Sequence, residues 1–190
     1  MAHSVCPWWI GYLLLNPFRR LAQDPREILA PYVSPGMTVL EPGPGMGFFT
    51  LELARLVGPA GRVVAVDVQP KMLDKLKRRA SSNGLQDRIE TRLVEKGSMA
   101  LSDLKGKVDF ALAFAMVHET PDPSPFFREV QEALKPGALV LLAEPQGHVK
   151  LPEFEQELKA AAGAGLAISD RPRIKRSHAV LLRKPSATDG

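Results

Sequence analysis

The pattern of apolar and polar residues alternates, from Gly36 onward, between short β-branched runs and longer amphipathic segments. This alternation is typical of βαβ units that stack into a parallel sheet, so we expect an α/β fold. The runs predicted as strands are 37–41, 62–67, 88–94, 108–115 and 138–143. The segments predicted as helices are 48–57, 70–82, 99–104, 124–134 and 151–162.

The end of the chain predicts two further strands, about 166–174 and 177–183, joined by a short connection near Lys175-Arg176. A connection that short favours antiparallel pairing, because a parallel pair needs a long crossover. A turn is expected at Lys135-Pro136-Gly137, before the fifth strand. The sheet is therefore predicted to be mixed but mostly parallel.

A helical cap is predicted before the sheet. Asp24-Pro25-Arg26-Glu27 has the pattern of a helix start, with an N-cap Asp, a Pro in the first turn and a Glu three residues after the cap. The apolar stretch 5–15 is shorter than the about 20 residues that span a bilayer, so no stable membrane insertion is expected. The predicted organisation is a single domain, with a cap over 1–33, a core over 34–184 and a tail over 185–190.

The composition supports one soluble globular domain. The chain has 190 residues, of which 45% are hydrophobic and 24% charged. Its one cysteine, Cys6, excludes an intramolecular disulfide framework and a site built from cysteines alone, so a cytoplasmic location is expected. A net charge of +4 is too small to demand a nucleic-acid partner.

The segment most informative about chemistry follows the first predicted strand, as Glu41-Pro42-Gly43-Pro44-Gly45-Met46-Gly47. Glycines at this place let the backbone turn sharply and let a ligand approach the amides of the next helix. The dinucleotide fingerprint GxGxxG fails, because Phe48 or Thr50 would replace its third glycine, and no GxxxxGK[ST] phosphate loop is present. What remains is the pattern E-x-G-x-G-x-G.

This pattern resembles motif I of class I S-adenosylmethionine-dependent methyltransferases, and the resemblance extends from Gly36 to about Lys184. It implies a Rossmann-like, seven-stranded sheet of order 3-2-1-4-5-7-6 flanked by helices, and S-adenosyl-L-methionine as the cofactor. In the family, the acid of motif I contacts the methionine ammonium and the acid after strand two accepts both ribose hydroxyls. The residues implied to bind the cofactor are Glu41, Gly43, Pro44, Gly45, Gly47, Asp67, Val68, Phe114 and Ala115.

Within the family, the segments VVAVDVQPKML and LKPGALVLLAEP are similar to those of the ubiquinone/menaquinone-biosynthesis methyltransferases. The chain departs from the family at the acid of the third strand, since neither Glu95 nor Asp103 has the usual context. The acceptor does not follow from the resemblance; we expect methyl transfer to a small, apolar or aromatic acceptor. RNA or protein methylation, and a non-catalytic S-adenosylmethionine-binding interaction protein, stay open as alternatives.

Candidate catalytic residues follow the fourth and fifth predicted strands, at the sheet edge where ligands of open α/β sheets bind. His118 is the first candidate for a general base, because imidazole titrates near neutral pH. Glu119 and Glu144 would orient it or bind a cationic acceptor, and His148 is a further candidate. These four side chains also suit zinc or iron, but without dense ligand spacing no metal is predicted.

Several acceptors and partners are disfavoured. In this family, methylation of the amino groups of nucleic-acid bases usually needs an Asn/Asp-Pro-Pro-aromatic loop after the fourth strand, and residues 115–118 have a different sequence there. Cytosine C5 methylation needs a nucleophilic cysteine in that region, and arsenic methylation needs several thiols. Cys6 alone meets neither need. The basic clusters 75–79 and 171–176 lack interleaved aromatic residues, so nucleic acid is not favoured and a small-molecule acceptor is expected. The pair Trp8-Trp9 would either close over the acceptor or pack on the sheet edge or on the partner of a homodimer.

Overall fold

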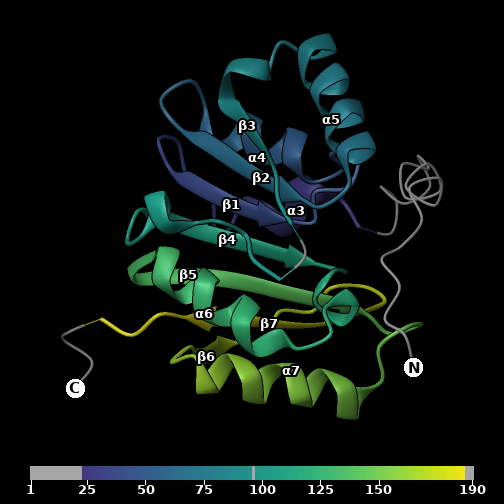
Figure 1. Cartoon of the computed structure of the whole chain (residues 1–190), viewed down its shortest axis with the longest axis vertical. Coiled ribbons are helices and arrows are strands. Elements are labelled where there is room, and N and C mark those ends of the chain that lie inside the picture. Colours follow the sequence, from purple (N-terminus) through teal and green to yellow (C-terminus); the bar gives the residue numbers. More distant parts are fainter. Residues whose placement is uncertain (1–22, 96, 187–190) are drawn as a thin grey trace. The chain divides into compact units, whose positions relative to one another are not determined.

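The computed structural model describes residues 23–95 and 97–186 (Figure 1). These residues form two compact units, one within 23–95 and one within 97–186, and each is described by itself. Most of the predicted cap, including Cys6, Trp8 and Trp9, lies outside the described residues, as does the end of the predicted tail.

The first unit is a parallel three-stranded sheet with helices. β2 pairs with both β1 and β3, with Glu41 opposite Ala65 and Asp67 opposite Leu93. The structure confirms the predicted bounds of β2 and α5 and places β1 and β3 within a residue or so of prediction. The elements are α3(Pro25–Leu29), β1(Thr38–Pro42), α4(Thr50–Val57), β2(Arg62–Asp67), α5(Pro70–Ser82), the 3₁₀ turn η1(Gln86–Arg88) and β3(Ile89–Leu93).

Local sequence signals set the ends of these helices. The Asp24 side chain accepts a hydrogen bond from the Arg26 amide at 2.8 Å and caps α3. Gly58 ends α4 with φ of 66°, a left-handed value that favours glycine. α4 begins at Thr50, later than the predicted residue 48, because turns continue through residues 45–49.

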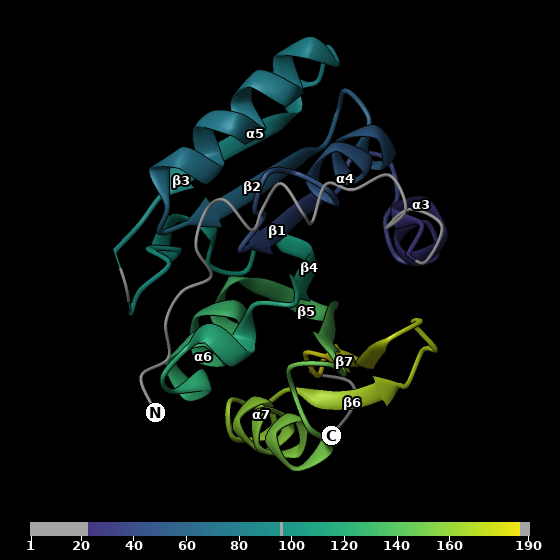
Figure 2. The same cartoon turned by 90° about the vertical axis from the view of Figure 1, so that its right-hand side faces the viewer.

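The second unit contains parallel and antiparallel strands. β4 pairs with β5 in parallel, whereas β7 pairs with β5 and β6 in the antiparallel sense, which confirms the predicted direction of the last strands. α6 and α7 pack against each other. The elements are η2(Ser102–Leu104), β4(Val108–Phe114), η3(Val117–Glu119), α6(Pro123–Ala133), β5(Leu134–Pro145), α7(Leu151–Gly163), β6(Ala167–Asp170) and β7(Ser177–Arg183), and Figure 2 gives a second view.

Three predictions in this unit were wrong in detail. The expected turn at residues 135–137 is an irregularity inside β5, where the pairing jumps from Val108 opposite Leu134 to Phe110 opposite Leu139. The helix expected at 99–104 is only the short 3₁₀ turn η2. β6 stops at Asp170 rather than 174, because Pro172 has no amide to donate to a ladder, so the last connection is longer than predicted.

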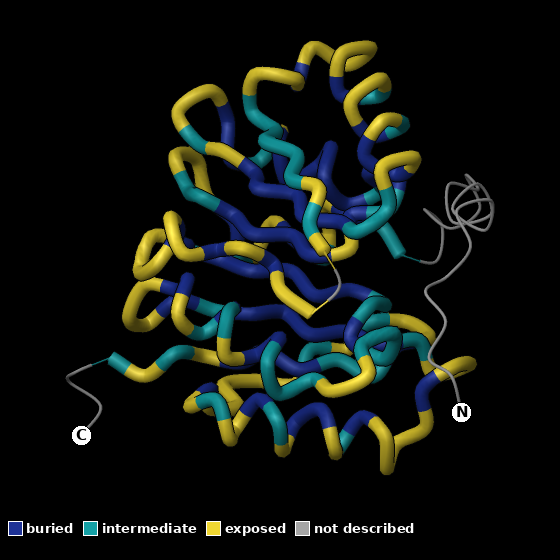
Figure 3. The backbone as a smooth tube through the Cα atoms, viewed as in Figure 1, coloured by how far each residue is buried: buried dark blue, intermediate teal, exposed yellow. Residues whose placement is uncertain are grey.

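The strand order is β3-β2-β1-β4-β5-β7-β6, which confirms the predicted order of a seven-stranded, mixed sheet. Strands β2, β4 and β5 are buried over most of their length (Figure 3), as expected of strands covered on both faces. Among the described residues, no helix is long and apolar enough to cross a membrane.

Candidate functional site

The glycine-rich loop connects β1 to α4 in the first unit. Gly43, Gly45 and Gly47 have φ values of 65°, 54° and 85°, all in the left-handed region that favours glycine. The Gly43 amide donates to the Val66 carbonyl of β2 at 2.9 Å, and the Gly47 amide donates to the Pro44 carbonyl at 3.0 Å. The alternating glycines of the motif are therefore required by the course of the backbone.

Glu41 lies at the penultimate position of β1 and is only 3% exposed. Its Oε2 and the Thr50 hydroxyl oxygen are buried atoms without a partner of hydrogen-bond geometry in the described structure. Burial raises the pKa of Glu41 to about 8; the nearby Thr50 hydroxyl lowers it, and the negative charge of Asp67 raises it further. Burial of Glu41 therefore favours the protonated form of its carboxyl group.

Asp67 ends β2 and is buried, and Val68 follows it. Its Oδ1 accepts a hydrogen bond from the Gln69 amide at 2.9 Å, which fixes the carboxylate beside the start of α5. β1 and β2 are neighbouring parallel strands, so the structure brings the two predicted cofactor acids to one edge of this unit. That arrangement is the one expected from the sequence.

These residues fit S-adenosylmethionine. The buried, unpaired oxygen of Glu41 can accept a hydrogen bond from an ammonium group, whose positive charge would also favour the ionised carboxylate. A Cβ atom built on Gly45 would meet nothing within 4 Å, so the loop leaves open space at this glycine. Asp67 offers the second carboxylate, with the chemistry suited to two hydroxyl groups.

In the second unit, the end of β4 leads into a strained turn. Phe114 is buried, and Ala115 has φ of 56°, a left-handed value that costs a residue with a side chain on the order of 1 kcal/mol. The Ala115 amide donates to the Ala143 carbonyl of β5 at 2.7 Å. This turn directs the next two amides, of Met116 and Val117, toward β5.

Glu144 of β5 receives those amides. One carboxylate oxygen accepts from Met116 at 3.2 Å and from Val117 at 2.7 Å, and the other lies 2.5 Å from Nδ1 of His118. Glu144 is completely buried, so the carboxylate is held by fixed donors rather than by water. The structure therefore brings together two predicted catalytic residues, His118 and Glu144, which are 26 residues apart in the chain.

His118 keeps part of its ring accessible, with 28% of the side chain exposed. Burial lowers its pKa, but the hydrogen bond and charge of Glu144, with the charges of Glu119 and Glu157, outweigh that effect, so the net pKa is raised. Since Glu144 accepts from Nδ1, neutral His118 has its lone pair on Nε2. The His148 ring is stacked on the His118 ring, with centroids 6.4 Å apart.

Glu157, on α7, was not among the residues predicted from the sequence. This residue is 6% exposed, and its Oε2 has no hydrogen-bond partner among the described residues. Burial and then the charge of Glu144 raise the pKa of Glu157 to about 8, while His118 acts to lower it and Glu153 to raise it. A glutamate on the buried helix face with Phe154 and Leu158 is the signal that could have found it.

No group of three or more histidine, cysteine, aspartate or glutamate residues in the described part of the chain is arranged to hold a metal ion. Phe114 and Ala115, predicted to bind the cofactor, lie in the second unit with His118, and Glu41 and Asp67 lie in the first.

A family model described as a methyltransferase domain matches residues 33–171, and the chain belongs to this family. The fold of this chain is similar to that of a solved SAM-dependent methyltransferase from Aquifex aeolicus, with a TM-score of 0.84 and 25% sequence identity. The match covers 95% of this chain and 100% of that one. Family and fold imply S-adenosylmethionine as the cofactor.

Curated relatives cover part of the chain. An arsenite methyltransferase from Halobacterium salinarum is 31% identical over 59% of this chain and 28% of its own length. A demethylmenaquinone methyltransferase from Lactococcus lactis is 33% identical over 64% of this chain and 46% of its own length. The chain thus spans less than half the length of these two relatives.

Proposed function

We propose that this protein transfers a methyl group from S-adenosylmethionine to a small, apolar or aromatic acceptor that must lose a proton, with His118 as the general base. The observation that carries the proposal is the 2.5 Å contact between His118 Nδ1 and the buried carboxylate of Glu144. A buried carboxylate behind a partly exposed imidazole is the arrangement of a histidine oriented to accept a proton.

Bound S-adenosylmethionine supplies an electrophilic methyl group on a sulfonium. The sulfur–methyl bond would break with its electron pair staying on S-adenosylhomocysteine as leaving group. His118 would accept at Nε2 the proton of the acceptor's O–H, N–H or activated C–H, which frees the acceptor's electron pair to take the methyl group. The imidazolium that results keeps its Nδ1–H on Glu144, whose negative charge stabilises it. The proton leaves His118 for solvent afterwards, because the ring is 28% exposed.

Glu144 acts in this scheme through His118. Two backbone amides hold its other oxygen, so the carboxylate neither rotates nor needs to reorganise when the imidazole becomes charged. Glu119, beside His118 on η3, adds negative charge that favours the protonated ring.

One of the relatives supports this acceptor class. The relative from Lactococcus lactis is named for demethylmenaquinone, a quinone-type acceptor. Another relative is an arsenite methyltransferase, but an arsenic acceptor is disfavoured here, because this chain has a single cysteine and arsenic methylation needs several thiols.

Cofactor binding is tested first, by thermal-shift titration with S-adenosylmethionine, S-adenosylhomocysteine and NAD side by side. At 100 times its dissociation constant, a ligand stabilises by about 2.7 kcal/mol, which raises the unfolding midpoint by several degrees. We expect a shift with both sulfur compounds and none with NAD. The absence of a shift with the sulfur compounds would overturn the proposal.

Catalysis is tested with methyl-labelled S-adenosylmethionine and a panel of quinols, phenols and amines. We expect label in a small extractable product and a fall in kcat of about 100-fold or more for His118→Ala. His178→Gln, at the third histidine of this unit, is the control for the loss of a histidine, because the His178 ring stacks on Phe154 and not on His118. Label recovered in protein or RNA would contradict a small acceptor, and bound cofactor with no transfer to any acceptor would indicate a binding protein instead.

A further inference from the structure

The glycine-rich loop is held by a helix that the family motif does not include. The guanidinium of Arg79, in the last turn of α5, donates through Nη1 to the carbonyl of Met46. The two residues are 33 positions apart, so this contact is tertiary and comes from outside the loop. It fixes the backbone between Gly45 and Gly47, where the left-handed conformations alternate.

The same helix packs directly on the last glycine of the loop. A Cβ atom built on Gly47 would lie 2.5 Å from Cδ1 of Leu76 and 3.7 Å from Nη1 of Arg79. Leu76 is completely buried and is three residues before Arg79, so both side chains leave the same face of α5. One face of this helix therefore meets the loop through an apolar contact and a charged hydrogen bond.

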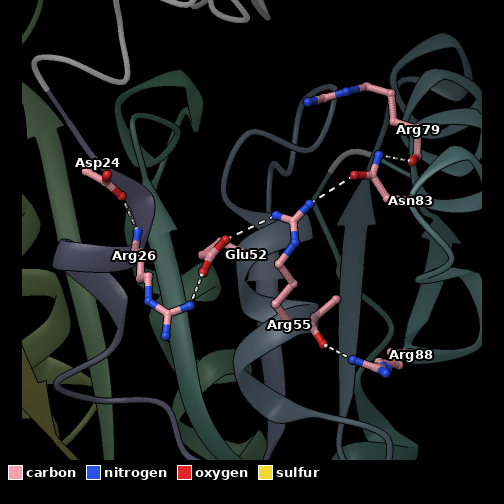
Figure 4. Close-up of polar contacts among 8 residues, drawn as sticks. Asp24, Arg26, Glu52, Arg55, Arg79, Asn83 and Arg88 are labelled. Atoms are coloured by element: carbon pink, nitrogen blue, oxygen red, sulfur yellow. Dashed lines mark hydrogen bonds and ion pairs between the residues drawn. The ribbon is translucent and has the colours of Figure 1, made fainter.

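A polar network fixes the turn of α5 that carries Arg79 (Figure 4). The Asn83 side chain donates to the Arg79 carbonyl at 2.8 Å and accepts from Arg55 of α4 at 2.9 Å. Arg55 in turn pairs with buried Glu52 at 3.1 Å, and Arg26 of α3 pairs with Glu52 at 3.4 Å. The backbone of Arg79 is thus tied to α4, which follows the loop in the chain.

The other end of α5 lies beside the second predicted cofactor acid. Gln69 is the N-cap of α5, and its amide donates to Asp67 at 2.9 Å. A single helix is consequently attached to Asp67 at its start and to the glycine loop at its last turn. Glycines lose more conformational freedom on ordering than other residues, so a loop with three of them gains most from an external anchor.

We propose that Arg79 is a positioning residue for the cofactor: by holding the Met46 carbonyl, it keeps the loop of Gly43, Gly45 and Gly47 in its binding conformation before the cofactor arrives. The inference rests on the proposed function, because it assigns a role toward S-adenosylmethionine. Arg79 lowers the ordering cost of binding rather than contacting the ligand.

The test compares Arg79→Met, which keeps an unbranched apolar stem and removes the donor, with Arg79→Lys and with Arg78→Met. Arg78 is the exposed neighbour on the same helix and serves as the matched control. Calorimetric titration with S-adenosylhomocysteine should show roughly tenfold or weaker affinity for Arg79→Met, since charge-assisted hydrogen bonds are the stronger ones. We expect a partial loss for Arg79→Lys and an unchanged affinity for Arg78→Met.

Hydrogen exchange without ligand separates positioning from a general structural role. In Arg79→Met, the amides of residues 43–49 should exchange faster, whereas those of β2 and β5 should exchange as in the unaltered protein. Equal affinity of Arg79→Met and Arg78→Met would overturn the proposal, and so would weaker affinity with unchanged exchange of the loop. Faster exchange in β2 would overturn it as well, because Arg79 would then support the unit as a whole. Failure of the unaltered protein to bind S-adenosylhomocysteine would instead contradict the proposed function.

Discussion

Each of the two units ends a buried strand with the same Glu-Pro dipeptide, but the two glutamates differ in the hydrogen-bond partners of their carboxyl oxygens. Glu41-Pro42 closes β1 and Glu144-Pro145 closes β5, with exposed fractions of 3% and 0% for the glutamates. Both oxygens of Glu144 have partners, from two backbone amides and His118. Glu41, by contrast, keeps Oε2 unpaired, and its pKa is raised to about 8.

This difference separates a carboxylate whose partners all come from the protein from a carboxyl group with one unpaired oxygen. Fixed donors surround Glu144, so the protein alone keeps that carboxylate in place to orient His118. Glu41 is buried at a cost that a cationic ligand would relieve, as expected of a residue that receives an ammonium group. A buried carboxyl is thus a binding residue or a support for another residue according to what the backbone next to it offers.

The largest effect on the free energy of unfolding is expected from replacing Glu144. Glu144→Ala leaves the part-buried amide of Met116, the buried amide of Val117 and the His118 Nδ1–H without an acceptor, which should lower the free energy of unfolding by about 3 kcal/mol. Glu144→Gln keeps one oxygen acceptor and should lose less. Urea unfolding at pH 7 measures both variants. A Glu144→Ala protein as stable as the unaltered one would show that the fixed donors contribute nothing.

Glu41→Gln is expected to act with the opposite sign. The pKa of Glu41 is about 8 in the folded state and near 4.5 in the unfolded chain, so between these values the folded state binds more protons and stability falls as pH rises. Gln does not titrate, so the variant should be equal in stability to the unaltered protein at pH 4 and more stable at pH 9, with the difference growing between pH 4.5 and 8 and levelling off above. Denaturant unfolding across this pH range measures the difference.

The same substitution also tests whether ligand binding changes the protonation of Glu41. If the cofactor's ammonium ionises Glu41, binding of S-adenosylhomocysteine at pH 7 releases protons, and the apparent binding enthalpy then depends on the ionisation enthalpy of the buffer. Glu41→Gln should weaken binding and remove that dependence. A buffer dependence that persists in Glu41→Gln would assign the proton to another group.

Asp67→Asn should have an intermediate effect, confined to binding. We expect about tenfold weaker affinity for S-adenosylhomocysteine, or about 1.4 kcal/mol, because an amide accepts hydrogen bonds from two hydroxyls less well than a carboxylate does. Asp67→Ala would also remove the acceptor of the Gln69 amide, so Asn is the cleaner change. Unchanged affinity in a titration would remove Asp67 from the cofactor site.

The smallest expected effect is that of Glu119→Gln on His118. The charge of Glu119 is one of the causes that raise the pKa of His118, and it ranks below Glu144. Imidazole NMR titration should therefore show a small fall in the pKa of His118 for Glu119→Gln and a larger fall for Glu144→Gln. Equal falls in the two variants would mean that the hydrogen bond to Glu144 has no special weight.

The order of the elements could be predicted from the sequence because hydrophobic period and Pro or Gly boundaries are local properties. Pro70 at the start of α5 and Gly58 after α4 act on their own residues, so those limits were predicted closely. The irregularity in β5 was not predicted, because it depends on which residues of a neighbouring strand are paired. Such pairing joins distant positions and leaves little local trace. The early end of β6 was also missed, although Pro172 marks it locally in the sequence.

The candidate site divides in the same way. The glycine loop, the acids Glu41 and Asp67, and the pair His118 and Glu144 could be recognised from the sequence, because each belongs to a short motif beside a predicted strand. The folded structure was needed to show that Glu144 contacts His118 while Glu41 has an unpaired oxygen. It was also needed to show that Glu157 feels the charge of Glu144 and that Arg79 contacts the glycine loop. The physical reason is that burial and hydrogen-bond donors come from segments far away in the chain, so two identical Glu-Pro dipeptides acquire different chemistry only when the strands and turns around them are in place.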